Sequence, residues 1–153
     1  MKEIRRRSAI GALLLAVTLV LANDAQQSLI FGNWLSEAKD GIIQISLASD
    51  ANYEGRIVGG NHPGRTDDKN PDPAERSKPL RGRVILRDLR YDGEGKWSGG
   101  LIYEPDTGRT YKCLVELVGP DKLKVRGFIG FSLLGKSQIW TRYFGTAMDL
   151  PAR

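Results

Sequence analysis

Most of the chain alternates between apolar and polar residues with a period of two, and turn-forming residues interrupt the pattern at short intervals. This alternation places successive side chains on opposite faces of an extended strand, whereas an amphipathic helix needs a period of about 3.6. It therefore predicts half-buried β-strands and an all-β domain. The predicted strands cover residues 33–37, 41–47, 53–59, 81–89, 95–103, 110–117, 122–130 and 136–144.

The connections between these strands are mostly short turns. Residues 40–41, 92–95, 104–108 and 119–121 each combine glycine or proline with aspartate, the residue types that tight turns favour. Consecutive hairpins form an antiparallel meander, and eight strands hide their edges best by curling into a closed barrel. We therefore expect one up-and-down eight-stranded barrel, with an interior that is either filled by side chains or open enough for one small ligand.

The N-terminal segment has the composition of a Sec-type signal peptide. Lys2 and the arginines at positions 5–7 precede an apolar stretch, residues 9–21, and the small residue Ala22. This stretch is shorter than the about 20 residues that cross a bilayer as a helix, so a retained anchor is the weaker reading. Cleavage after Ala22 predicts an exported protein, periplasmic or secreted, with no stable membrane span. The expected organisation is a signal peptide (1–22), a spacer (23–30), the barrel (31–145) and a C-terminal tail (146–153).

The formal charge of +5 gives little support to nucleic-acid binding. The basic residues before position 8, with Glu3, carry about three of these charges, and the rest are interspersed with acidic residues. Cys113, the only cysteine, cannot form an intramolecular disulfide and lies in an alternating strand, so we expect a buried, inert thiol. We therefore predict no nucleic-acid partner and a domain stabilised by its core.

One long connection, residues 60–79, breaks the rhythm of short turns, and it is either a functional loop or a lid over one mouth of the barrel. Its acidic part imitates half of a calcium loop, but Pro73 and Pro79 replace the glycine and glutamate that an EF-hand requires. We expect these polar residues to cap the backbone of the loop or to take part in recognition. The polar cluster consists of Asp67, Asp68, Asn70, Asp72 and Arg76.

The sequence contains no recognisable catalytic constellation. His62, the only histidine, has no cysteine partners for zinc, and we find neither a nucleophile elbow nor a phosphate-binding glycine loop. We therefore predict a protein without enzymatic activity, cofactor or metal; a weak enzyme would need the acidic cluster to converge with Lys69 or Arg76 in a cleft. If the barrel is partly open, one alternating subset is predicted to line it: Trp97, Leu101, Tyr103, Cys113, Val115 and Val125.

Several motifs along the chain resemble one bacterial family, the domain-of-unknown-function family 2147. The motifs are Gly55-Arg56-Ile57-Val58, residues 66–72, residues 76–86, residues 96–105, residues 108–111, residues 123–127 and Trp140-Thr141-Arg142. The resemblance covers residues 31–143 and implies an exported protein with a barrel like those of lipocalins or fatty-acid-binding proteins. It implies no catalytic residues. The cysteine pair that family members commonly carry before the Gly-Arg-Ile segment is missing here.

Gly32-Asn33-Trp34 also looks like the G-x-W signature of lipocalin-type barrels. That likeness implies that Trp34 packs at the closed end of the barrel beneath Arg142 of the last strand, where a guanidinium on an indole stabilises by roughly 0.5–2 kcal/mol. The predicted function is a periplasmic binder or carrier of a small apolar molecule. The alternative is an envelope interaction or structural module with a filled barrel and no ligand.

Overall fold

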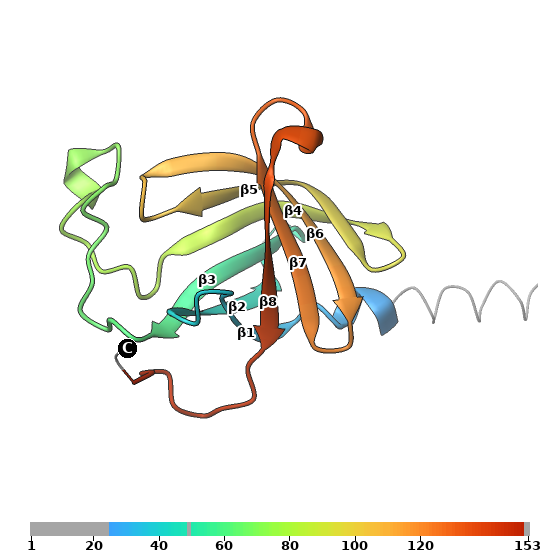
Figure 1. Ribbon diagram of the computed structural model, residues 1–153, viewed down its shortest axis with the longest axis horizontal. Helices are drawn as coiled ribbons and strands as arrows, with labels where there is room; N and C mark the ends of the chain where they lie inside the picture. The colour runs from blue at the N-terminus through green and yellow to red at the C-terminus, as the bar shows by residue number, and fades with distance from the viewer. Residues whose placement is uncertain (1–24, 49, 152–153) are drawn as a thin grey trace, which may run out of the picture.

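The computed structural model describes residues 25–48 and 50–151, which form a closed antiparallel barrel in which every strand pairs with its neighbours in chain order (Figure 1). The predicted all-β eight-stranded barrel is therefore confirmed, while the predicted signal peptide lies outside the described residues. The strands are β1 (Gly32–Leu35), β2 (Gly41–Leu47), β3 (Tyr53–Gly60), β4 (Val84–Gly93), β5 (Lys96–Glu104), β6 (Arg109–Gly119), β7 (Lys122–Phe128) and β8 (Lys136–Arg142). Short 3-10 helices, η1 (Pro73–Glu75) and η2 (Ser132–Leu134), lie in two of the connections.

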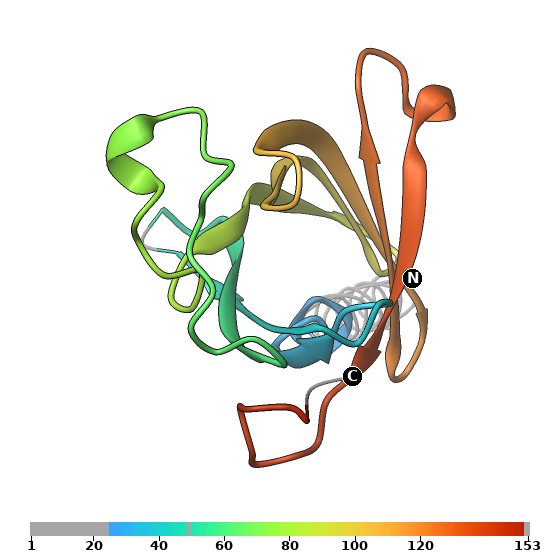
Figure 2. The ribbon, with the colours of Figure 1, turned by 60° about the vertical axis from the view of Figure 1, so that its left-hand side comes forward.

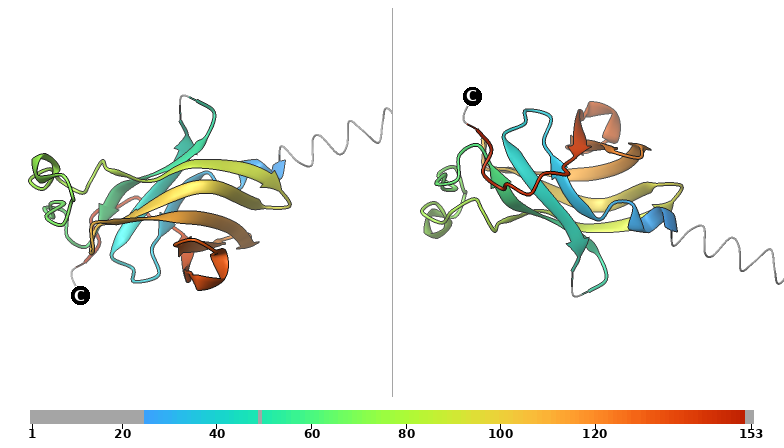
Figure 3. Two further views of the ribbon diagram at one scale, coloured as in Figure 1. Left: turned by 90° about the horizontal axis from the view of Figure 1, so that it is seen from above. Right: turned by 90° about the horizontal axis from the view of Figure 1, so that it is seen from below.

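The barrel closes where β1 pairs with β8. Trp34 and Leu35 lie opposite Arg142 and Thr141, so the first and last strands share a hydrogen-bonded edge. Figure 2 looks into the resulting ring, and Figure 3 places the long β3–β4 connection at one end and a helical turn, residues 25–28, at the other. Pairing of β1 with β8 leaves no long unpaired edge, which is the advantage that favours a barrel over an open sheet.

The strand boundaries differ from the predicted ones mainly at β4. This strand begins at Val84 instead of residue 81, because Gly82, with φ of +92°, and Arg83 still belong to a turn. The backbone N–H of Gly82 donates to the carbonyl of Ile57, and that of Ile57 donates to the carbonyl of Arg83. The β3–β4 connection is thus residues 61–83, slightly longer than expected.

A β-bulge in β5 changes which side chains face the interior. Trp97 pairs with Val115, but the next interior position is Gly100, since a Cβ there would lie 2.6 Å from the side chain of Leu89. Gly99, between them, has a φ of +73°, which suits glycine. After the bulge, Ile102 faces inward, opposite buried Leu86, and Leu101 faces outward.

The closed end of the barrel is built around Trp34, whose side chain is fully buried. Its Nε1–H donates to the carbonyl oxygen of Ile30 at 2.8 Å, and the guanidinium of Arg142 lies 4.1 Å from the centre of its ring. Arg142 also donates to the carbonyl oxygens of Phe31 and Leu29, at 2.9 and 2.5 Å. Ile30 is completely buried, so the end of the predicted spacer is part of the core.

A packed core fills the half of the barrel above this closed end. It contains two further tryptophans, Trp97 and Trp140, and the thiol of Cys113, whose pKa burial raises to about 12. The C-terminal segment folds back beside β3, where the backbone N–H of Gly60 donates to the carbonyl of Met148 and the carbonyl of Gly60 accepts from the N–H of Leu150. Across residues 25–48 and 50–151, no helix is long and apolar enough to cross a membrane.

We predict that Arg142→Ala lowers the free energy of unfolding by about 2–4 kcal/mol, because it removes the indole contact and two charge-assisted hydrogen bonds from a mostly buried site. Urea unfolding followed by tryptophan fluorescence measures the change. Arg109→Ala, at an exposed strand end, is the control and is expected to change it by under about 0.5 kcal/mol. Equal effects of both variants would contradict this account of the closed end.

Candidate ligand cavity at the open end of the barrel

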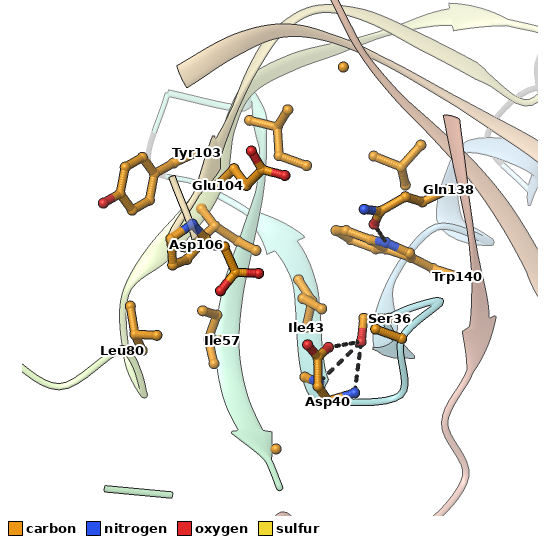
Figure 4. Close-up of a pocket in the computed structure, with 18 of the residues that line it drawn as sticks. Ser36, Asp40, Ile43, Ile57, Leu80, Tyr103, Glu104, Asp106, Gln138 and Trp140 are labelled. Atoms are coloured by element: carbon orange, nitrogen blue, oxygen red, sulfur yellow. Dashed lines mark hydrogen bonds between the residues drawn. The ribbon is translucent and has the colours of Figure 1, made fainter. Parts of the chain in front are cut away.

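The half of the barrel away from Trp34 is hollow. A cavity of about 980 Å³ extends from the core to the open mouth, where the β1–β2, β3–β4, β5–β6 and β7–β8 connections form the rim (Figure 4). Its floor includes Trp140 and Val125, which also belong to the packed core. A volume of this size lies at the upper end of the about 300–1,000 Å³ typical of small-molecule pockets.

The wall of the cavity is largely aliphatic. Its aliphatic side chains come from strands β2 to β5, from β7 and from the end of the long connection, and they include Ile43, Ile57, Leu80, Ile85, Ile102 and Val125. In Figure 4, Ile43 and Ile57 lie side by side on adjacent strands, as their pairing in the β2–β3 register requires. Burying an apolar guest here would remove its surface from water at a gain of roughly 25 cal/mol per Å².

Several polar side chains also line the cavity, and those of the β1–β2 connection are bonded to one another. Ser36 Oγ donates to Asp40 Oδ1 at 2.6 Å and accepts from the backbone N–H groups of Asp40 and Gly41 (Figure 4). On the opposite wall, Trp140 Nε1–H donates to Gln138 Oε1 at 3.1 Å. These bonds orient the polar groups and leave a mostly apolar surface for a guest.

Charged residues occupy the rim. Arg65 in the long connection pairs with Asp106 in the β5–β6 turn at 2.5 Å, and Arg81 pairs with Asp149 of the C-terminal segment. His62, also at the rim, contacts Asn61 Oδ1 through Nδ1 at 2.7 Å. The two ion pairs join segments far apart in the sequence, so they help to fix the beginning and the end of the long connection.

Asp67 is the anchor of that connection. Its side chain is 0% exposed, and its carboxylate accepts hydrogen bonds from Tyr103 Oη at 2.6 Å and Asn70 Nδ2 at 2.7 Å. Arg83 Nε lies 2.8 Å from Oδ2 as an ion pair, although its N–H is not aligned for a hydrogen bond. Arg83 also pairs with Glu75. The buried carboxylate of Asp67 thus links the loop to Tyr103 of β5 and to Arg83, which directly precedes β4.

The other predicted polar residues shape the loop locally. Asn70 accepts from the backbone N–H of Asp72, and Asp72 caps η1 by accepting from that of Ala74, each at 2.9 Å. Arg76 Nε donates to the carbonyl of Asn70, while Asp68 is exposed and lies 3.8 Å from Lys69. Within the described ranges, no group of three histidine, cysteine or acidic side chains is arranged to hold a metal ion.

The predicted interior residues divide into three groups. Val125 lines the cavity, and Tyr103 borders it only at the rim, because the bulge turns its side chain outward, where the hydroxyl meets Asp67. Trp97, Cys113 and Val115 face inward but lie in the packed core. Leu101 faces outward because the bulge at Gly99 reverses the alternation of β5.

Sequence reasoning missed much of the cavity wall. Ile43 and Ile57 could have been found from the alternation within β2 and β3, which shows the same period of two as β5 and β6. Leu80 and Arg65 could not, because the long connection has no period that reveals which of its residues turn toward the mouth.

Comparisons with known proteins agree with this architecture. The family described as "Uncharacterized protein conserved in bacteria (DUF2147)" matches residues 32–142, which confirms the resemblance inferred from the motifs. A solved structure, described as "Protein HP1028 from the human pathogen Helicobacter pylori belongs to the lipocalin family", superposes with a TM-score of 0.67. It is 20% identical and covers 74% of this chain and 82% of its own, so the likeness shows a lipocalin-like fold. No curated protein matches the sequence.

The pKa of Tyr103 is expected to report the hydrogen bond between Tyr103 and Asp67. Burial, followed by the hydrogen bond to Asp67, raises the pKa of Tyr103 from 10.0 to about 12. The folded state therefore holds this proton more tightly, and stability is retained below pH 10 and lost as the pH rises toward 12. Spectrophotometric titration should show a tyrosinate step near pH 12 that Tyr103→Phe removes and Tyr143→Phe, outside the cluster, leaves in place. Persistence of that step in Tyr103→Phe would contradict the assignment.

Proposed function

This chain belongs to the DUF2147 family of bacterial proteins, and we propose that it binds or carries one small, largely apolar molecule in the open half of its barrel. The observation that carries the proposal is the cavity of about 980 Å³ with its aliphatic wall. A fold hosts many functions, so the lipocalin-like architecture adds only that barrels of this kind have an interior that can hold a ligand.

The arrangement of the rim supports reversible binding. The long connection is tethered at Asp67 and by the Arg65–Asp106 pair, and the latter is solvent-exposed on both sides. Exposed ion pairs contribute only about 0–1 kcal/mol, so the outer part of the connection can separate from the β5–β6 turn while the buried anchor persists. A guest could then enter without unfolding the barrel.

We propose a binding role and not a catalytic one. The carboxylates of Asp67 and Asp72 are used in folding the loop, Asp40 is bonded to Ser36, and Asp106 is bonded to Arg65. Binding of an apolar guest needs none of these groups as an acid, base or nucleophile. We further propose that the protein works after export, in the periplasm or outside the cell, without a nucleic-acid partner.

The second candidate function, an interaction module with a filled barrel, draws support from a different feature. Large apolar side chains are exposed on the β7–β8 connection, as expected of a surface that meets a partner. The cavity argues against the filled barrel that this alternative assumed. Contact through that connection and a guest in the cavity are compatible.

Ile57→Trp tests the proposal by filling the cavity from its wall. Native mass spectrometry of the protein purified gently from a bacterial periplasm should show wild type with an adduct of a few hundred daltons that is lost on denaturation. An indole that overlaps the guest costs roughly 1–3 kcal/mol, so occupancy should fall about tenfold or more.

Val118→Trp places the same side chain at a half-exposed position outside the cavity and should retain the adduct. Thermal unfolding of both variants verifies that they fold. Wild type without an adduct, even after incubation with membrane extract, would refute the proposed function, as would an adduct that Ile57→Trp leaves unchanged.

A further inference from the structure

Among the described residues, the three most exposed large apolar side chains lie on one short connection, between β7 and β8. We call residues 129–134 the apolar tip. Ile129 is 67% exposed, Phe131 80%, Leu133 89% and Leu134 80%. In Figures 1 and 2 the connection projects beyond the rest of the barrel, so these side chains form a convex point and not a flat face.

The backbone of the apolar tip is unusually well satisfied for an exposed turn. The guanidinium of Arg126 donates from Nε to the carbonyl of Ser132 at 2.7 Å and from Nη2 to that of Leu133 at 3.2 Å. The backbone N–H of Leu134 donates to the carbonyl of Phe131. Unpaired backbone groups are what makes entry of irregular chain into lipid costly, and here three of the carbonyls of the turn already have partners.

The charged side chains at the base of the apolar tip are basic. Of the five lysines and arginines between Asp121 and Asp149, a segment without acidic residues, Arg126 and Lys136 flank the connection, whereas Arg142 lies at the closed end. Lys136 pairs with Gly127 and Lys112 pairs with Phe128, so both lysines lie at the base of the connection beside Arg126. Exposed apolar side chains next to lysines and arginines are the combination that binds an anionic membrane surface.

The apolar tip is also continuous with the cavity mouth. Phe128, Ile129, Leu134 and Lys136 line the cavity as well as the connection. Any surface to which the apolar tip binds would therefore lie next to the open end of the barrel.

We propose that the apolar tip inserts into the surface of an anionic lipid bilayer, with Lys112, Arg126 and Lys136 facing the headgroups and the mouth of the cavity next to the membrane. A second copy of the chain fits less well, because the same positive segment would face itself and a projecting point offers little area for a dimer. This inference rests on the β7–β8 connection and holds whether or not the cavity contains a guest.

The test is sedimentation with vesicles of phosphatidylcholine and phosphatidylglycerol in a 3:1 ratio, and with phosphatidylcholine alone. The test variant is Phe131→Ser combined with Leu133→Ser and Leu134→Ser. The matched control is Phe144→Ser, since Phe144 is 77% exposed but follows the other end of β8. All proteins carry the same N-terminus, verified by mass spectrometry, so any binding through residues 1–24 is common to them.

Wild type and Phe144→Ser are expected to bind the anionic vesicles with partition coefficients within about twofold of each other. The partition coefficient of the triple variant should be lower by about tenfold or more, because each lost apolar side chain removes part of the area buried in the membrane. Vesicles of phosphatidylcholine alone, or added salt, should weaken wild-type binding. Because all three side chains are exposed, the melting temperature should change little.

Phe131→Trp gives a direct readout of insertion. The three native tryptophans are buried in the barrel, so a shift of emission to shorter wavelength on adding anionic vesicles reports the new indole. Absence of both binding and shift would overturn the proposal, as would equal binding by wild type and the triple variant. A concentration-dependent dimer in sedimentation velocity that the triple variant abolishes, without vesicle binding by wild type, would assign the tip to self-association instead.

Discussion

The structure depends on the joining of the two ends of the barrel. Without the pairing of β1 with β8, the sheet would have two open edges and its interior would be exposed to water. The pairing itself is short, and Arg142 reinforces it by binding the face of Trp34 and two carbonyls of the segment before β1. Because Ile30 accepts the hydrogen bond from the Trp34 indole, the chain before the first strand becomes the plug of the closed end.

Closure at one end permits a hollow at the other. The tryptophans, together with Leu86, Leu89 and Leu123, fill the lower half of the barrel and supply its burial of apolar surface. The upper half is lined by aliphatic side chains that do not meet across it, so their surface can be covered by a guest. The stability of the protein and its proposed function thus draw on separate parts of the same barrel interior.

The polar residues of the long connection also fall into two groups, a buried cluster around Asp67 and exposed ion pairs at the rim. Asp67, although it is in a loop, is among the most buried residues, because Tyr103, Asn70 and Arg83 satisfy its carboxylate. A buried carboxylate without such partners would cost several kcal/mol, so these contacts define one position for the base of the loop. The exposed pairs at the rim, in contrast, are weak enough to open, and the apolar tip beside them offers a second surface next to the mouth.

The sequence by itself determined the strands, their order and the closed barrel, because a period of two and the turn residues act locally and eight hairpin-linked strands have few ways to bury one face. The likeness to the lipocalin-type G-x-W signature also implied that Trp34 of the first strand and Arg142 of the last are partners. Only the tertiary structure decided that Leu101 faces outward, because a single bulge at Gly99 inverts every later position of β5. Likewise, whether Trp97 or Ile57 borders empty space depends on the height of each side chain along the barrel axis, which alternation between two faces does not encode.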